Sequence, residues 1–329
     1  MTLCVAWLRE INKEQELIFA TDSCLSGGER WHSGVKLFEL PRKDCLICFA
    51  GETNRTYPLI LNLITSIKFD EHLSNSHTDI TEVLDYLTRL FTSLCHSITD
   101  YGTQEFRNVL GDFQFLFGGW SWKANQFKLW KLEYNHEAGA FVHDETNGDD
   151  MLYCFIGDEL EKSQELLVDQ ISKSGKTLSR RFDMEPFKVL IEMIRNTCYS
   201  GIDGAVQLAK IHPPGATEFL GVYWPSVGGK KTFLGKDVST ENNPAVKFVD
   251  PDTGEILEDA LPETLSFSRV DKELYGDHTD FLVKCYPEGR LKAGLSKRDR
   301  SLLKAIIGQI AYSQFIECQQ QTADEEQVE

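Results

Sequence analysis

The order of strand-like and helix-like segments is the feature that most limits what this chain can fold into. Short apolar runs bounded by turn residues predict strands, and apolar residues that recur every three or four positions predict helices. The predicted strands lie at 3–8, 17–21, 35–40, 45–50, 113–120, 127–134, 151–156, 218–224 and 231–235. The predicted helices lie at 54–67, 83–94, 159–172 and 184–198.

These segments form blocks in the order strands, two helices, strands, two helices and strands. Alternating strand–helix–strand units would favour a parallel sheet, whereas segregated blocks favour antiparallel sheets with helices packed outside them. We therefore expect an α+β domain over residues 1–238, with two antiparallel sheets and outer helix layers.

The sequence changes character after residue 238. We expect residues 239–329 to form a C-terminal extension that is separate from the first domain. Its expected parts are a linker at 239–244, a hairpin at 245–257, a helix at 296–317 with Ser296 as N-cap, and a polar, acidic, disordered tail at 319–329.

Charge and composition limit the function classes. The 51 acidic and 34 basic residues give a formal net charge of −17. Binding to nucleic acid needs a basic surface, so we expect no nucleic-acid partner. The sequence contains no run of about 18 apolar residues, the length that a membrane-spanning helix needs. Its first residues lack the pattern of a secretory signal. We expect a cytoplasmic protein that does not bind a membrane.

The cysteine and histidine patterns predict neither a metal centre nor a cofactor. The nine cysteines are scattered, and only Cys45 and Cys48 form a CxxC, inside a strand-like run. A zinc site would need a second ligand pair at a suitable spacing. The eight histidines include no HExxH pair. We expect reduced thiols, most of them buried.

Four short motifs occur in order along the first predicted strands. They are Met1-Thr2-Leu3-Cys4, Ala20-Thr21-Asp22-Ser23, Val35-Lys36-Leu37-Phe38 and Phe49-Ala50-Gly51-Glu52. In this order and at these separations they resemble the motifs of proteasome β-type subunits and their bacterial relatives, the HslV-related and ancestral Anbu groups. The resemblance continues through 118–120, 201–207 and 219–224, and it covers roughly residues 1–238.

The resemblance implies a fold, an activity and an assembly. The family folds as a four-layer αββα sandwich of the N-terminal-nucleophile (Ntn) hydrolase type, and a threonine at the new amino terminus attacks the substrate. This role falls to Thr2, while Asp22, Lys36 and Gly51 match the family's aspartate, lysine and glycine at the following strands. The resemblance also implies a peptide or protein substrate and a homo-oligomeric ring or open helical stack. It leaves open whether an ATPase or another regulator binds.

Elementary chemistry supports Thr2 as a nucleophile. Its small side chain allows methionine aminopeptidase to remove Met1, which gives one residue both a hydroxyl and a free α-amine. An α-amine has a pKa of about 7.7–8.0, so it can accept the hydroxyl proton near neutral pH. A buried lysine nearby would lower the proton affinity of both groups.

The charges of Asp22 and Lys36 are expected to form a pair. Strand alternation places Asp22 on a face with Ala20 and Lys36 on a face with Phe38, so both charges point toward apolar surroundings. Buried charges need partners. The backbone N–H of Gly51 is the candidate oxyanion donor. Taken singly, each residue has a simpler explanation. Asp22 would cap a turn, Lys36 would extend its ammonium to water, and Gly51 would be an ordinary turn glycine.

Two later motifs of the family are altered in this chain. Active proteasome subunits carry a serine after a glycine at the end of a later strand, where this chain has Gly157-Asp158-Glu159. They also carry an Asp-x-x-Ser-Gly-Gly motif, where this chain has Ser200-Gly201 followed by Asp203. Asp158, Ser200 and Asp203 are therefore candidate supporting residues.

The predicted function is cleavage of peptide amide bonds through an acyl-enzyme on Thr2. Two alternatives stay open. A catalytically inactive proteasome-like scaffold or regulatory subunit would retain Met1 or leave Thr2 unreactive. An amidase of the same fold would act on a small non-peptide amide, and fold alone does not separate it from a peptidase.

Overall fold

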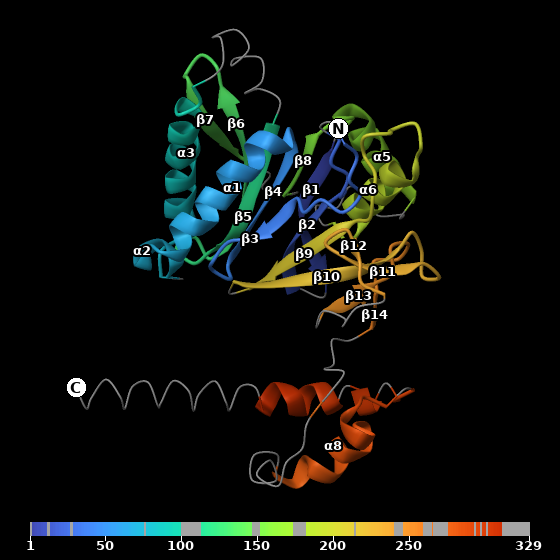
Figure 1. Cartoon of the computed structure of the whole chain (residues 1–329). Coiled ribbons are helices and arrows are strands. Elements are labelled where there is room, and N and C mark those ends of the chain that lie inside the picture. Colours follow the sequence, from blue (N-terminus) through green and yellow to red (C-terminus); the bar gives the residue numbers. More distant parts are fainter. Residues whose placement is uncertain are drawn as a thin grey trace, which may run out of the picture. The chain divides into compact units, whose positions relative to one another are not determined.

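The computed structural model describes most of the first 258 residues and part of the remainder. The described residues are 2–11, 14–26, 29–75, 77–99, 113–146, 152–173, 182–213, 215–239, 246–258, 265, 276–292, 294–296, 298–300 and 302–310. The chain divides into two compact units, Met1–Glu258 and Asp259–Glu329 (Figure 1).

The larger sheet of the Met1–Glu258 unit has nine described strands. They are β1 (Leu3–Ile11), β2 (Glu14–Thr21), β8 (Tyr153–Gly157), β9 (Gln207–His212), β10 (Ala216–Trp224), β11 (Lys230–Phe233), β12 (Lys236–Asp237), β13 (Lys247–Val249) and β14 (Ile256–Glu258). Their main order is β12-β11-β10-β9-β2-β1-β8. Strand β13 joins by parallel pairing with β10, and β14 pairs with β13.

The smaller sheet has five described strands in the order β3-β4-β5-β6-β7, with antiparallel neighbours. They are β3 (Leu37–Glu39), β4 (Cys45–Gly51), β5 (Phe113–Ser121), β6 (Gln126–Asn135) and β7 (Ala140–Glu145). The described helices of this unit are α1 (Thr53–Lys68), α2 (Glu71–Ser74), α3 (Ile80–His96), α5 (Leu160–Lys173) and α6 (Glu185–Arg195).

Three hydrophobic clusters define the layers of this unit. One cluster joins α1 and α3 to the five-stranded sheet, a second joins α5 and α6 to the nine-stranded sheet, and a third lies between the two sheets. The order of layers is therefore helices, sheet, sheet, helices (Figure 1). The α+β class with two sheets, expected from the block order, is confirmed.

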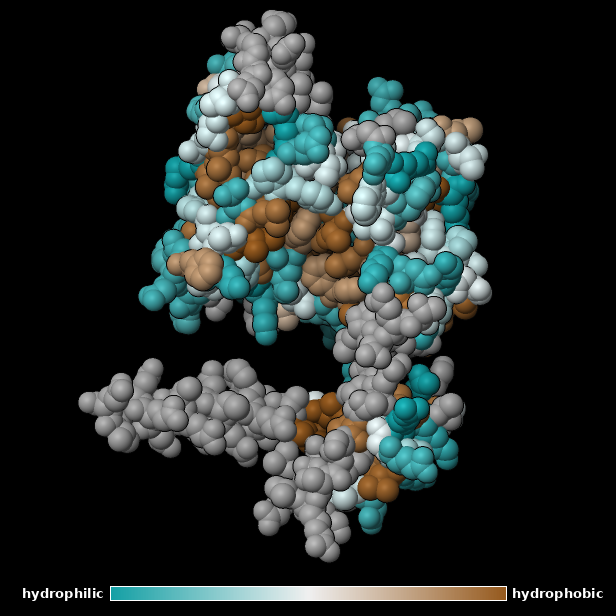
Figure 2. Space-filling view, in the orientation of Figure 1, coloured by the Kyte–Doolittle hydropathy of each residue, from teal (hydrophilic) through white to brown (hydrophobic). Residues whose placement is uncertain are grey.

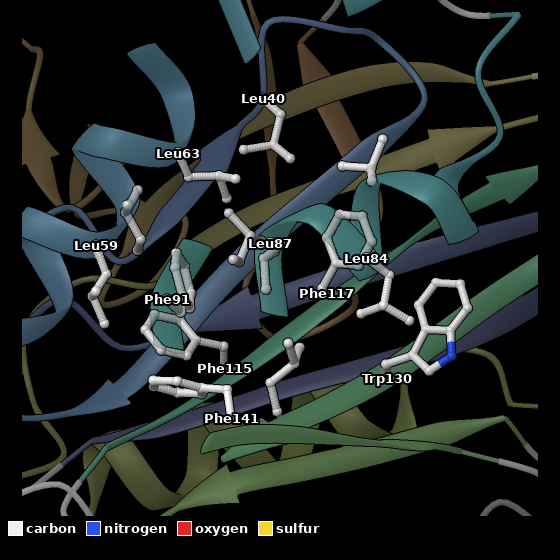
Figure 3. Close-up of a cluster of buried hydrophobic side chains, with 14 of the residues drawn as sticks. Leu40, Leu59, Leu63, Leu84, Leu87, Phe91, Phe115, Phe117, Trp130 and Phe141 are labelled. Carbon is white, nitrogen blue, oxygen red and sulfur yellow. The ribbon is translucent and has the colours of Figure 1, made fainter. Parts of the chain in front are cut away.

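The outer cluster beneath α1 and α3 is rich in aromatic rings. Phe91 of α3 lies 4.8 Å from Phe115 and 5.5 Å from Phe141 between ring centroids. Leu59 and Leu63 of α1 point into the same cluster (Figure 3). Their spacing of four residues places them on one face of the helix, so the apolar periodicity read from the sequence corresponds to this contact.

Strand β1 shows why residues 3–8 are apolar at consecutive positions. Leu3, Val5 and Trp7 pack in the cluster that includes α6, whereas Cys4 and Ala6 pack in the cluster between the sheets. A strand buried on both faces loses the usual alternation of apolar and polar residues.

Some apolar side chains remain at the surface, and Figure 2 shows hydrophobic residues on the viewed face between α1 and α6.

Strands β7 and β9 and the short helix α2 are among the elements that were not expected from the sequence. Strand β7 ends in His143, Asp144 and Glu145, and β9 contains Gln207 and Lys210, so neither has a continuous apolar pattern. Helix α2 lies in the segment expected to be a polar link. Strand β7 pairs with the preceding β6 and α2 contacts the preceding α1, whereas β9 pairs both with the following β10 and with β2, which is distant in sequence.

The Asp259–Glu329 unit contains described helical segments. They are η1 (Gly276–His278), α8 (Thr279–Cys285), η2 (Pro287–Gly289) and the helical residues 298–300 and 302–310. The Ser296 hydroxyl accepts the backbone N–H of Asp299 at 3.1 Å, which confirms Ser296 as an N-cap. The expected acidic tail at 319–329 lies outside the described residues.

The expected domain boundary near residue 238 differs from the division between the compact units, which follows Glu258. The reason is the pairing of β13 with β10, which places part of the predicted 245–257 hairpin inside the nine-stranded sheet. A separate role for residues 239–329 stays a prediction. Among the described residues, no helix is both long and apolar enough to cross a lipid bilayer.

Truncation of the Phe91 ring should destabilise the protein strongly. Phe91 is fully buried, so we expect Phe91→Ala to lower the free energy of unfolding by about 3–5 kcal/mol. Urea unfolding measures the change. The control is Phe69→Ala, since Phe69 is 79% exposed and its truncation should change stability by about 0.5 kcal/mol or less. Equal losses of unfolding free energy in both variants would contradict the burial of Phe91 in the outer cluster.

Candidate active site

The buried side chain of Lys36 is the centre of the candidate site. Its Nζ atom lies 2.9 Å from each carboxylate oxygen of Asp22 and 2.7 Å from Oγ1 of Thr2. Lys36 and Asp22 are fully buried, and Thr2 is 3% exposed. An ammonium has three N–H donors, so these contacts match its donor capacity.

Strand pairing brings Thr2 and Asp22 together. Thr2 directly precedes β1, Asp22 directly follows β2, and Cys4 pairs with Thr21 in the antiparallel register. The N–H of Leu3 donates to Oδ1 of Asp22 at 3.2 Å, and the N–H of Asp22 donates to the carbonyl of Leu3 at 3.4 Å. The backbone thus holds the Asp22 carboxylate beside residue 2.

Lys36 reaches the site from the other sheet. The sequence predicted Lys36 inside a strand at 35–40, but β3 begins at Leu37, so Lys36 lies just before it. The Lys36 carbonyl accepts the N–H of Phe49 in β4 at 3.3 Å. Because Asp22 directly follows β2 of the nine-stranded sheet and Lys36 directly precedes β3 of the five-stranded sheet, their ion pair links the two sheets.

The side chain of Gln207, at the start of β9, fixes the position of Lys36. Its buried oxygen accepts the N–H of Lys36 at 3.0 Å and that of Leu37 at 3.2 Å, and its amide donates to the carbonyl of Gly34 at 2.5 Å. The backbone of Gln207 also pairs with the last residue of β2, next to Asp22. One side chain therefore links the segment of Lys36 to the strand end that carries Asp22.

In the sequence, Gln207 is the last residue of the segment 201–207 that resembles the family, and no role is predicted for it. The available signal is a long polar residue at the beginning of the run Leu208-Ala209, where the neighbouring positions are apolar. A buried amide must be hydrogen-bonded. That requirement indicates a structural or functional contact but does not identify its partner.

The Asp22 carboxylate is buried and has several hydrogen-bond donors. Besides Lys36 and Leu3, the N–H groups of Cys24 and Asp203 donate to it at 3.0 and 3.4 Å. Burial raises the pKa of Asp22 above its usual value, and the Lys36 charge and N–H donors oppose this rise. Buried ion pairs add little to stability because both charges lose hydration, so this pair is a candidate for a functional role.

The turn after β8 holds the backbone of residue 2. The N–H of Thr2 donates to Oδ2 of Asp158 at 2.6 Å, and the N–H of Asp158 donates to the carbonyl of Thr2 at 2.8 Å. Gly157 has a φ of +107°, and a Cβ on it would stand 2.0 Å from the carbonyl oxygen of Thr2. Only glycine fits here. Asp158 therefore lies in the candidate site.

Gly51 lies at the end of β4 and has a φ of +107°, a region that favours glycine. Its neighbour Ala50 is close to the turn that holds residue 2, since a Cβ on Gly157 would stand 3.1 Å from the Cβ of Ala50. These contacts place the end of β4 near the residue-2 turn. The role of the Gly51 N–H as an oxyanion donor stays a prediction.

The remaining two candidates differ in their relation to the site. The main chain of Asp203 contacts it, because its N–H donates to Asp22 and its carbonyl accepts the N–H of Ser23 at 3.2 Å. The Asp203 carboxylate instead forms an ion pair with Arg30. Ser200 is exposed in the turn after α6. The structure thus brings Asp203 to the site through its backbone and leaves the Ser200 side chain in solvent.

The two cysteines of the CxxC motif, Cys45 and Cys48, are buried free thiols. Burial raises the pKa values of the Cys45 and Cys48 thiols well above the usual range, which keeps both protonated at neutral pH. Within the described residues, no group of three or more His, Cys, Asp or Glu side chains is arranged to hold a metal ion.

Comparisons with solved structures match this chain to Anbu proteins. The Anbu complex from Pseudomonas aeruginosa, a helical assembly, is 16% identical, with a TM-score of 0.45 over 66% of this chain and 87% of that chain. Anbu from Yersinia bercovieri is 18% identical, with a TM-score of 0.43 over 64% and 82%. A Gly-1 mutant of Anbu from Hyphomicrobium sp. strain MC1 is 13% identical, with a TM-score of 0.42 over 64% and 83%.

These structures belong to the group that the sequence motifs resemble. No protein-family model and no curated protein matches the chain.

Removal of the Gln207 amide should destabilise the candidate site. Gln207→Leu leaves two buried N–H groups without their acceptor, and we expect the free energy of unfolding to fall by about 2 kcal/mol or more. Urea unfolding measures the loss. The matched control is Gln114→Leu, because Gln114 is partly exposed and its amide contacts the side chain of Glu133. A loss no larger than that of the control would contradict the bridging role of Gln207.

Proposed function

We propose that this chain is an Ntn hydrolase that cleaves peptide amide bonds with Thr2 as the nucleophile, after removal of Met1. The observation that carries the proposal is the contact of Lys36 Nζ with Oγ1 of Thr2 at 2.7 Å, beside the Asp22 carboxylate. A buried ammonium this close to a hydroxyl stabilises the alkoxide form over the neutral form. The four layers of helices and sheets are then those of an Ntn hydrolase.

The first step transfers the Thr2 hydroxyl proton to the free α-amine of the same residue. The oxygen forms a bond to the carbonyl carbon of the substrate, and the resulting oxyanion accepts hydrogen bonds from nearby donors, with the Gly51 N–H as the candidate. The C–N bond of the substrate then breaks as the α-ammonium returns its proton to the departing amine. A water molecule hydrolyses the ester on Thr2 and restores the hydroxyl.

Asp22 acts on this chemistry through Lys36. Both oxygens of its carboxylate lie 2.9 Å from Nζ, which fixes the direction of the ammonium toward Thr2. The low exposure of all three side chains strengthens these interactions, because water screens them little.

Assembly into a homo-oligomeric ring or open helical stack belongs to the same proposal. Such an assembly would restrict access to the site and so limit cleavage to extended peptides or unfolded proteins. Light scattering and electron microscopy of the purified protein would detect either form. Peptide cleavage by a monomeric protein would agree with the catalytic proposal and contradict the proposed assembly.

The decisive experiment is intact-mass analysis of the purified protein with and without a threonine-directed electrophile such as an epoxyketone. We expect loss of the Met1 mass and addition of one inhibitor mass. Thr2→Ala should abolish the adduct and lower peptide cleavage by about 10³-fold or more. The control is Thr65→Ala, which removes a hydroxyl from an exposed position of α1.

Two results would contradict the catalytic proposal. Retention of Met1, or a processed Thr2 that forms no adduct, would favour a catalytically inactive scaffold. Undiminished cleavage by Thr2→Ala would assign the activity to another residue. Cleavage of small amides without cleavage of peptides would keep the mechanism and favour an amidase.

Separate variants can distinguish the catalytic and structural effects of Lys36. Lys36→Met leaves the buried Asp22 carboxylate uncompensated, and we expect a loss of about 3–5 kcal/mol in unfolding free energy. The double variant Lys36→Met/Asp22→Leu replaces both charges with apolar groups, so stability should largely return. Adduct formation on Thr2 should stay at least about 100-fold slower in both variants.

The control for these variants is Arg42→Met, because Arg42 also forms a buried ion pair, with Asp44. This variant should lose stability but react with the electrophile at the normal rate. A normal rate of adduct formation in the Lys36→Met/Asp22→Leu double variant would contradict a catalytic role for Lys36.

A further inference from the structure

The turn after β8 contacts both main-chain polar groups of residue 2. The Asp158 carboxylate accepts the Thr2 N–H at 2.6 Å, and the Asp158 N–H donates to the Thr2 carbonyl at 2.8 Å. The nitrogen in the first contact is an amide in the translated chain. After Met1 is removed, as the proposed function requires, the same nitrogen becomes the α-amine that serves as the base.

The backbone of this turn takes unfavourable conformations to make these contacts. Gly157 has a φ of +107° and Glu159 a φ of +57°. The second value is uncommon for a residue with a side chain and is found where the surroundings enforce it. The backbone N–H and hydroxyl of Ser163 both donate to the Glu159 carbonyl at 2.9 Å, which fixes the turn to the first turn of α5. The position of the Asp158 carboxylate is therefore built into the fold.

The charged side chains of Lys36 and Asp158 contact residue 2, at Oγ1 and at the backbone nitrogen. Asp22 contacts Lys36 and the backbone of Leu3, and the acidic residues Glu159 and Glu161 follow Asp158 in sequence. The Lys36 ammonium contacts both Asp22 oxygens at 2.9 Å, so these two charges largely cancel at the α-nitrogen. Glu159 and Glu161 are exposed and are screened by water. The Asp158 carboxylate is in direct contact with the nitrogen, at 2.6 Å.

We infer that Asp158 is the counter-ion of the freed α-ammonium of Thr2 and sets the pH at which this amine becomes a base. A carboxylate at hydrogen-bond distance stabilises the ammonium over the neutral amine, so the amine releases its proton only at higher pH. Asp158 is thus a positioning residue that orients the amine and raises the pH at which the amine becomes a base.

The consequence for the enzyme is an alkaline-shifted activity. Below the pKa of the amine, the nitrogen carries a proton and cannot accept another from the Thr2 hydroxyl. The rate of acylation should therefore rise with pH above the range of about 7.7–8.0 that is typical of an α-amine. Near neutral pH only a minor fraction of molecules would be competent.

The test compares Asp158→Asn with the unmodified sequence. Asparagine has the same shape and keeps an oxygen acceptor for the nitrogen, but it carries no charge. We expect the acid limb of the pH profile for adduct formation with an epoxyketone to move down by about one pH unit or more in Asp158→Asn. Glu161→Gln is the control, because it removes an exposed carboxylate from the same turn region and should leave the limb in place.

A second measurement reads the amine without catalysis. NMR titration of the ¹⁵N-labelled Thr2 α-amine should give a pKa above the usual range, and this pKa should fall in Asp158→Asn. An unshifted amine in a protein that forms the adduct would overturn the role of Asp158 and leave the hydrolase proposal intact. A shifted amine in a protein that forms no adduct would support the counter-ion and overturn the hydrolase. Retention of Met1 would overturn both.

Discussion

The ion pair between Asp22 and Lys36 determines the geometry on which the rest of the site depends. The two residues come from different sheets, and both side chains are fully buried. Separation of the pair would leave uncompensated charges in an apolar interior, which costs about 3–5 kcal/mol. The spacing of the two sheets at this point is therefore tightly constrained. Because Thr2 Oγ1 is the remaining acceptor of the Lys36 ammonium, the same constraint fixes the hydroxyl.

The elements with regular apolar spacing were predictable from sequence because their periodicity reports burial directly. Helices α1 and α3 begin and end within three residues of the predicted limits. Strand β9 was missed because Lys210 interrupts its pattern. In the fold, the Lys210 ammonium contacts Glu16 at 2.8 Å and Glu218 at 3.5 Å, on the two strands beside β9. A charge neutralised by neighbouring strands has no local signature in the sequence.

The neighbourhood of Thr2, Asp22 and Lys36 was predictable because their motifs occur in the order found in the family they resemble, and because two charges on apolar faces require a common partner. The contacts of Gln207 and Asp158 were not predictable in the same way. The first depends on the register of β9 against β2, and the second on the unusual backbone of the turn after β8. Their identities as a buried amide and a carboxylate were visible, but their partners were not.

The parallel pairing of β13 with β10 has a practical consequence for handling the protein. Phe248 of β13 lies over Gly221 of β10, where a Cβ would stand 2.5 Å from its ring. A fragment cut after residue 238 would uncover this ring contact and leave unsatisfied main-chain groups along β10, and an open strand of this kind is a template for aggregation. Shortened versions of the protein intended for crystallisation or labelling should therefore extend through Glu258.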